Sequence, residues 1–542
     1  MNSGNTNAYK TITSTNSSEL ENLWVTGSGN GAKATGYWID SDRQEATFTN
    51  LGNIYVTAVG GADSWSQRAI GAADGATAIN KGTIVVQNAY GMTVGSDGNG
   101  PAPATIINEG SIAVYETGAA MELGGVKGST AENKGQIYVG KPSENDGAFT
   151  IGVLVKDHKE GTFTNSGLID AKEATAAITV QKGTSTTDKN TILLTSGSQT
   201  LGNILIDAPN TTLNMEDGAV YEGSIFVSEN AAKTAISGTQ KAVGLTASNG
   251  AALFLAPADS SASIKNALYS GNKAIGTTDA SGNTFAMGGA VYSNGSPIYF
   301  ENTVFDGNSA AITAPSKDTD AATGGAIQIK GSPDTVFKDV VFTNNSATVT
   351  GADGKGAYAF GGAINVDYST GSATGVKRDS DVKFIITKDL AYTGNTVSSD
   401  GTGKPDTWGY THSHTQAGGF LFLDRGSVAT FEVQGTATLT IGEEGTTGDT
   451  DSIASSMPNN TTANGGQHAL LNKTGSGTLL VNSDLNKYYG TTAVQEGTMH
   501  VTSEWLVQHN VNVNFQRFPT LDAKKLVNAP KMSAHHRGIC HF

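Results

Sequence analysis

The chain has 542 residues, of which 69 are glycine and 12 proline, with 37% hydrophobic and 15% charged residues. So low a hydrophobic share excludes several thick globular cores and favours a thin-cored, turn-rich β architecture. The formal net charge of −15 argues against nucleic acid as a partner, because phosphate binding needs a basic surface. The single cysteine, Cys540, excludes an internal disulfide.

The N-terminal third repeats the pattern Asn-x-Gly-x-Ile at intervals of 25 to 32 residues. The repeats begin at Asn50, Asn80, Asn108, Asn133 and Asn165. Apolar residues two apart follow each glycine, and this period predicts a strand with one buried face. Such a strand once per repeat, with no helical pattern between, is typical of a right-handed parallel β-helix, an all-β solenoid.

Stacking of these coils in register makes three predictions. We expect one inward column formed by Ile54, Ile84, Ile112 and Ile137. We expect a ladder of turn side chains formed by Asn50, Asn80, Asn108 and Asn133. The glycine of each repeat is expected to supply the positive φ of a tight turn before the strand.

The middle third carries two further phrases that recur together. Gly-Gly-Ala begins at Gly288, Gly324 and Gly361, with Gly-Gly-Phe at Gly418. Phe-x-x-Asn or Tyr-x-x-Asn begins at Tyr269, Phe305, Phe342 and Tyr392. We interpret each repeat as a pair of coils. Ile327 and Ile329 are expected in one strand, Val336, Val340 and Phe342 in the next, and Asn345 as the cap of a turn.

These phrases resemble the GGAI and FxxN repeats of the polymorphic outer-membrane proteins, which are autotransporter (type V secretion) passengers. Downstream, residues 472–501 resemble the autotransporter-associated β-strand repeat, in three elements at Lys473 to Leu479, Tyr489 to Thr492 and Gly497 to Val501. Met499 stands where the repeat usually has leucine. Together the resemblances cover residues 288–501. They imply a surface-displayed passenger whose C-terminal coils act as a folding nucleus and cap.

The expected organisation is one elongated solenoid. Residues 1–40 form an N-terminal cap or flexible start, 41–240 the Asn-x-Gly-x-Ile coils, 241–440 the GGA/FxxN coils, and 441–507 the C-terminal coils. Residues 508–542 form an atypical tail that is a linker, an artificial addition or a truncated reading. Coils of ~25 residues between residues 40 and 505 predict ~18 coils and a rod of roughly 90 Å.

Motifs that would indicate catalysis or a cofactor are missing from the sequence. No CxxC, HExxH or Gly-Asp-Ser-Gly occurs. Asp449 and Asp451 are expected on one strand face at solvent, where short acidic turns are common. We therefore predict no catalysis, no cofactor and no metal. The alternatives are a carbohydrate-active β-helix enzyme, either a polysaccharide lyase or a glycosidase, and a binding protein like a phage tail fibre.

One insertion is the predicted binding site. The Gly-Gly spacing stretches to 57 residues between Gly361 and Gly418, and the surplus is assigned mainly to residues 398–416. This segment contains Trp408, Tyr410, His412 and His414. Insertions in solenoids form surface loops that often bind partners, and aromatic rings suit sugar or protein contacts. The alternatives are that the rings pack within the loop, or that His-x-His holds a metal.

The function expected from the resemblance is that of an adhesin or self-association module. Its partners would be a protein or glycan on a host or bacterial surface, or a second copy. We expect it on the bacterial outer membrane surface or secreted. The signal peptide and the membrane barrel are expected to lie outside this chain.

Overall fold

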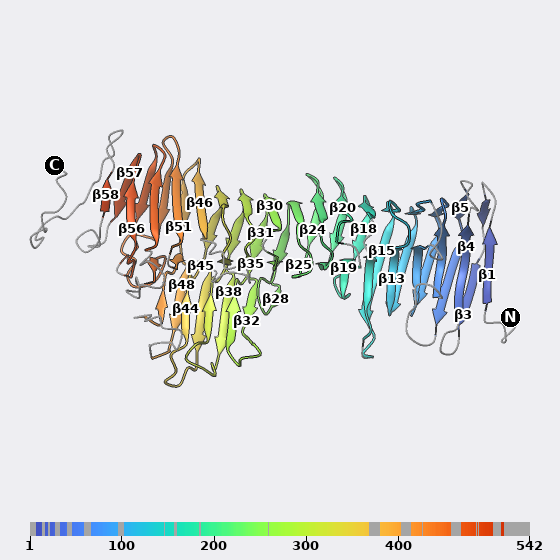
Figure 1. The fold of residues 1–542 in the computed structure, drawn as a ribbon, viewed down its shortest axis with the longest axis horizontal. Helices are drawn as coiled ribbons and strands as arrows, with labels where there is room; N and C mark the ends of the chain where they lie inside the picture. The colour runs from blue at the N-terminus through green and yellow to red at the C-terminus, as the bar shows by residue number, and fades with distance from the viewer. Residues whose placement is uncertain are drawn as a thin grey trace, which may run out of the picture.

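A computed structural model describes most of the chain, and every regular element in the described residues is a β-strand. The described residues are 7–12, 17–19, 22–27, 33–40, 46–58, 67–95, 102–145, 147–156, 160–183, 186–257, 259–367, 380–402, 414–424, 426–456, 468–483, 485, 487–501 and 511–513. They form an elongated rod whose first strand, β1, and last strand, β58, lie at opposite ends (Figure 1). No helix that would span a membrane occurs among them.

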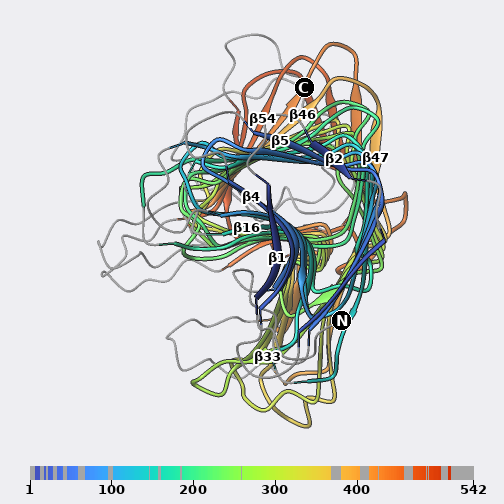
Figure 2. The same cartoon turned by 90° about the vertical axis from the view of Figure 1, so that its right-hand side faces the viewer.

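Three long parallel sheets form the walls of the rod. Sheet 1 has 15 strands, from β1 (Asn7–Ile12) to β53 (Ile453–Ser455). Sheet 2 has 17 strands, from β2 (Ser17–Glu19) to β58 (Val511–Val513). Sheet 3 has 12 strands, from β3 (Asn22–Gly27) to β42 (Val341–Thr343). Viewed along the rod, successive coils superpose around a narrow core (Figure 2). The fold is a parallel β-helix, as the sequence predicts.

Each coil of the N-terminal third contributes one strand to each sheet. In one such coil these are β7 (Gln67–Ala73), β8 (Thr77–Asn80) and β9 (Thr83–Gln87), and β10 (Tyr90–Val94) begins the next. The predicted isoleucine column is confirmed. Ile54 pairs with Ile84, Ile84 with Ile112 and Ile112 with Ile137, and all four are 1% exposed or less.

The predicted asparagine ladder is also confirmed. Each Nδ2 donates to the Oδ1 of the next coil, over 2.7 Å from Asn50 to Asn80 and 2.8 Å from Asn80 to Asn108 and from Asn108 to Asn133. The ladder continues to Asn165, whose Nδ2 donates to Thr200 Oγ1 over 2.9 Å. Buried amides are therefore satisfied by one another along the stack.

The role predicted for the repeat glycines is wrong. Gly82, Gly110 and Gly135 do not have a positive φ. A Cβ on Gly110 would instead lie 2.1 Å from the carbonyl oxygen of Gly82, and one on Gly135 would lie 2.0 Å from that of Gly110. Glycine is needed there because the backbones of successive coils touch at this turn, and no side chain fits between them.

The middle third has larger coils, so the interpretation of each repeat as a coil pair is wrong. One repeat is a single coil of five strands: β40 (Ile327–Lys330), β41 (Thr335–Lys338), β42, β43 (Ser346–Thr350) and β44 (Tyr358–Phe360). Ile327 and Ile329 share β40 as predicted. The strand predicted for Val336, Val340 and Phe342 is wrong. Val336 lies in β41 and Phe342 in β42, with Val340 between the two strands, because Asp339, at φ 51°, turns the chain there.

The additional strands of these coils form a side lobe on the rod (Figure 1). Its sheets each have five strands. One runs from β28 (Thr246–Ala247) to β48 (Thr396–Ser399), and the other from β33 (Thr277–Thr278) to β49 (Gln416–Ala417). The lobe has a small core of its own, mainly alanine and valine, that includes Ala310, Val349 and Ala359.

The two recurring phrases have direct packing reasons. The first glycine of each Gly-Gly pair has a positive φ, as at Gly324 (63°), and a Cβ on the second, Gly325, would lie 2.0 Å from the Gly362 carbonyl oxygen. The aromatic residue of Phe-x-x-Asn stacks in the core, with 5.2 Å between the ring centroids of Phe305 and Phe342.

The asparagine of Phe-x-x-Asn forms a second ladder. Asn345 donates to Asn395 over 2.9 Å at the turn before β43, as its predicted capping role requires. The ladder as a whole contains Asn272, Asn308, Asn345, Asn395 and Asp451.

The described residues between 40 and 505 form fewer coils than predicted. Sheet 2 has 15 strands there, from β5 (Thr47–Asn50) to β56 (Thr491–Val494), where ~18 were expected. The enlarged middle coils use 36 or more residues each, as between Ile327 and Ile364. All 17 coils of sheet 2 stacked at ~4.8 Å give a rod of roughly 80 Å.

The C-terminal coils contain the three elements of the downstream repeat. β54 (Leu470–Thr474) pairs with β56, and β55 (Thr478–Val481) pairs with β57 (Thr498–Val501), so that Leu479 faces Met499 across the stack. The buried Lys473 donates from Nζ to three carbonyl oxygens, of Thr474 at 2.8 Å, Gly475 at 2.6 Å and Glu496 at 3.0 Å. Lysine in this motif therefore joins two turns of neighbouring coils.

The ends of the chain also contribute strands to the sheets. β1 to β4 (Lys33–Asp40) lie within residues 1–40 and join sheets 1, 2 and 3. At the other end, β58, within residues 508–542, pairs with β56.

Candidate functional site

The coils stack without interruption across the predicted insertion. β45 (Ile364–Asp367) pairs directly with β50 (Leu421–Leu423), so Ile364 faces Leu421 although 57 residues separate them. The Gly362 amide donates to the Gly418 carbonyl oxygen over 2.9 Å. The described strands of this coil therefore stack on the next coil although the chain between them is longer than in the preceding repeat.

The pairing register corrects the position of the surplus residues. The offset between paired residues is 37 at Lys330 and Asp367, 47 at Phe337 and Phe384, 50 at Ser346 and Thr396, and 57 at Phe360 and Ala417. Half of the surplus thus lies between β45 and β46 (Asp381–Ile386), and a smaller part lies between β48 and β49. The spacing between two Gly-Gly motifs gives only the total number of additional residues. It cannot show which turn of the coil holds them.

The predicted bounds, 398–416, also include residues of the lobe sheets. Ser398 and Ser399 lie in β48, and Gln416 lies in β49. Trp408, Tyr410 and His412 lie outside the described residues, so their predicted contacts stay a prediction. His414 is described, at the start of the short segment that leads into β49.

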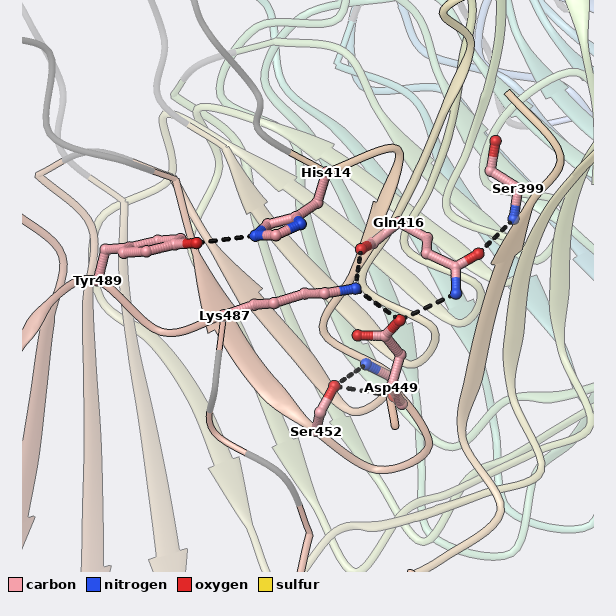
Figure 3. Close-up of polar contacts among 8 residues, drawn as sticks. Ser399, His414, Gln416, Asp449, Ser452, Lys487 and Tyr489 are labelled. Carbon is pink, nitrogen blue, oxygen red and sulfur yellow. Dashed lines mark hydrogen bonds and ion pairs between the residues drawn. The ribbon is translucent and has the colours of Figure 1, made fainter. Parts of the chain in front are cut away.

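A polar network, here called the anchor, joins the strands on either side of residues 403–413 to the next coils (Figure 3). The Ser399 amide donates to Gln416 Oε1 over 2.8 Å, and Gln416 Nε2 donates to Asp449 Oδ2 over 2.9 Å. Lys487 Nζ donates to the same Asp449 oxygen over 2.8 Å and to the Gln416 carbonyl oxygen over 2.9 Å. The Lys487 and Asp449 side chains are only 26% and 13% exposed.

His414 makes a separate contact with the C-terminal coils. Its Nε2 lies 2.7 Å from Tyr489 Oη, and the two rings stack at 6.2 Å between centroids (Figure 3). Burial lowers the pKa of the His414 imidazole, and the nearby Lys487 ammonium lowers it further against the opposing effect of Asp449. The imidazole is therefore neutral at pH 7. Its Nε2 then either accepts the Tyr489 hydroxyl proton or donates to the hydroxyl oxygen, according to the tautomer.

The expectation that Asp449 and Asp451 share a strand face at solvent is wrong. Both lie in the turn before β53, and Asp451 has a φ of 51°. Asp449 belongs to the anchor, whereas Asp451 is 1% exposed and ends the second asparagine ladder. Asp451 accepts from the Gly394 amide over 2.8 Å and from the Asn395 amide and Nδ2 over 2.8 and 2.9 Å. Burial raises its pKa in opposition to these three hydrogen bonds.

The anchor contains residues that sequence reasoning missed. Lys487 is 71 residues from Gln416, and no motif connects them. The only signal in the sequence was the repeat itself, since stacking in register brings the turn at Asp449 and the segment before β56 next to the insertion. Among the described residues, no group of three or more histidine, cysteine, aspartate or glutamate side chains is arranged to hold a metal ion.

Comparison with known families matches part of the chain. Residues 1–157 match the family described as the BigA third pectate lyase-like domain. Curated proteins gave no match.

Proposed function

We propose that the protein is a non-catalytic binding rod, namely a surface-displayed or secreted bacterial adhesin or self-association module. It would recognise partners through segments inserted into the coils of a rigid β-helix. The observation that carries the proposal is the anchor. The strands β45 and β50 pair directly across the insertion, and both strands that flank residues 403–413 are bonded to neighbouring coils. β48 pairs with β43, and Gln416 of β49 is bonded to Asp449 and Lys487. A segment held at both ends loses less conformational entropy when it binds a partner.

The choice of residues 403–413 over other additions rests on the composition of the segment. It contains Trp408 and Tyr410, whose rings supply large contact areas with few rotatable bonds. The partner class is a protein or glycan of a host or bacterial surface, or a second copy of the chain. The resemblance to autotransporter passengers supports the surface location, and the rod of roughly 80 Å would carry the segment away from that surface.

The proposal is tested with purified full chain on an array of glycans and matrix proteins. The test variant deletes residues 403–413 and keeps the strands β48 and β49, which the wider deletion of 398–416 would damage. The matched control deletes residues 368–379, the other addition to the same coil. We expect the 403–413 deletion alone to lose binding, with far-ultraviolet circular dichroism unchanged in both variants, because shortening a loop has little effect on stability. Equal binding by all three proteins would contradict the proposal.

A carbohydrate-active enzyme is the second candidate, favoured by the "pectate lyase-like" description of the family matched by residues 1–157. A lyase forms an unsaturated product that absorbs ultraviolet light. Incubation of the full chain with polygalacturonate and calcium tests this directly. A steady rise in absorbance that depends on protein concentration would show lyase activity and would contradict the proposal of a non-catalytic binding protein.

A further inference from the structure

The outer side of sheet 3 in the N-terminal third carries an unusual set of exposed aromatic side chains. It is formed by β3, β6 (Asn53–Ala58), β9, β12 (Ser111–Glu116) and β15 (Gln136–Pro142). Its central column pairs in register through five coils and is called the aromatic column: Trp24, Tyr55, Val85, Ala113 and Tyr138. Trp24 is 62% exposed and Tyr138 41% exposed.

The aromatic column has tall rings at both ends and small side chains between them. Trp24 stacks on Tyr55 with 4.1 Å between ring centroids and 12° between planes. At the other end stands Tyr138, and beside it Tyr115 of β12, 50% exposed, lies over Gly140, where a Cβ would be 3.3 Å from the Tyr115 ring. Between Tyr55 and Tyr138 the column has only the smaller side chains of Val85 and Ala113. Four coil spacings make the column roughly 19 Å long.

The column is flanked mainly by polar residues, and the charges of these strands gather toward its Tyr138 end. There β12 carries Glu116, β15 carries Lys141, and the next strand, β18 (Leu168–Asp170), places Asp170 beside Tyr138. Strands β3, β6 and β9 contain no charged residue, although the whole chain has a net charge of −15. Thr26 and Thr57 are exposed beside the column. Glu116, at the end of β12, accepts from Gln87 Nε2 over 2.6 Å and from Asn88 Nδ2 over 2.7 Å, so its carboxylate is already engaged.

We propose that the aromatic column binds a neutral oligosaccharide chain that lies along the rod axis. Apolar ring faces for pyranose C–H groups, with hydroxyl and amide groups beside them, are the chemistry that recognises uncharged sugars. The coil spacing of ~4.8 Å is comparable to the length of one sugar unit in an extended chain. The charge of −15 opposes polyanionic glycans such as polygalacturonate.

A second copy of the chain fits the column less well than a sugar chain. The column and its flanking rows cover roughly 19 by 13 Å, about 250 Å². A stable protein interface buries about 800 Å² on each partner, roughly three times as much. The proposal is independent of residues 403–413, whose flanking strands β48 and β49 pair only with strands of the middle and C-terminal coils, so each site can fail without the other.

The test is isothermal titration of the full chain with neutral hexasaccharides, namely cellohexaose, maltohexaose and mannohexaose, and with hexagalacturonate as the anionic probe. We expect at least one neutral probe to bind with a dissociation constant below one millimolar. Trp24→Ala should weaken that binding about tenfold or more, and Tyr138→Ala severalfold. The control Phe226→Ala removes an aromatic side chain that is 43% exposed on a different sheet and should change nothing. The deletion of 403–413 should also leave this binding intact.

Four results would overturn the proposal. These are no binding of any neutral hexasaccharide, unchanged binding by Trp24→Ala and Tyr138→Ala, tighter binding of hexagalacturonate than of every neutral probe, and an equal loss with Phe226→Ala. Sedimentation velocity tests the alternative that a second copy of the chain binds the aromatic column. Concentration-dependent dimers that disappear in Trp24→Ala would identify the column as an interface between copies.

Discussion

Replacement of Leu479 by aspartate should unfold the C-terminal end of the rod. Leu479 is fully buried and pairs with Leu439 on one side and Met499 on the other. Loss of its apolar burial costs about 2 kcal/mol. The new carboxyl must be protonated to stay buried, which costs about 4 kcal/mol at pH 7, and its unmet hydrogen bonds add about 1–3 kcal/mol. The total of roughly 7–9 kcal/mol is comparable to the whole stability of a typical domain.

Two control variants separate the effect of burying a charge from the effect of the position of the substitution along the rod. Leu480→Asp changes the next residue of the same strand, whose side chain is only partly buried, and should cost about 1 kcal/mol. Lys383→Asp removes the ion pair with Glu432, 2.6 Å away, whose partners are 43% and 25% exposed, and should cost about 1 kcal/mol in the middle of the rod.

Limited proteolysis followed by mass spectrometry is the assay. In Leu479→Asp, cleavage should begin between residues 426 and 501, at protease concentrations that leave the two controls intact. The N-terminal coils should survive, because each coil of a solenoid depends mainly on its neighbours. Equal protease sensitivity of Leu479→Asp and Lys383→Asp would refute the idea of a stabilising C-terminal cap.

Three further predictions concern the stack itself, each measured by urea denaturation. Asn108→Ala should lower the free energy of unfolding by about 2–4 kcal/mol, because it breaks hydrogen bonds to two coils. The control Asn145→Ala, at an exposed position, should leave it unchanged, and similar effects of the two substitutions would contradict the ladder. Gly325→Ala should prevent close stacking, since its Cβ would lie 2.0 Å from a carbonyl oxygen, whereas Gly124→Ala has 3.6 Å of room; a stable Gly325→Ala protein would disprove the contact. Burial lowers the pKa of Lys473 to about 8 from 10.5, so the folded chain binds fewer protons than the unfolded chain between those values. The stability of the wild type relative to Lys473→Met should therefore rise as the pH increases from 8 to 10, and a constant difference would contradict this.

The sequence predicts those parts of the fold that depend on repetition. The isoleucine column and the first asparagine ladder follow from identical residues at similar intervals, because stacking in register places like on like. For the second ladder only the capping role of Asn345 was predicted. The five-strand coils did not follow, since the short lobe strands are rich in alanine and threonine, as in β39 (Ala321–Thr323), and have little apolar alternation. The glycines of the first repeat were predicted to have a positive φ, which they do not have. They are required by close contact with the backbone of the next coil, and a contact between distant residues cannot be recognised from the neighbouring sequence.

The candidate site was only partly predictable from the sequence. The insertion was visible as a break in the Gly-Gly spacing, and His414 was named from it. Its link to Tyr489 and the contacts of Lys487 with Gln416 and Asp449 join residues 38 to 75 apart, and only the stacking register brings them together.

The most direct test of the proposed binding function is retention of coated beads on host cells and on bacteria. Beads carry equal amounts of the full chain, the 403–413 deletion or the 368–379 deletion, and are counted after a fixed wash. Binding through residues 403–413 predicts retention, or clumping of the beads, by the full chain and the 368–379 deletion, and its loss with the 403–413 deletion. Equal counts for all three coatings would contradict it.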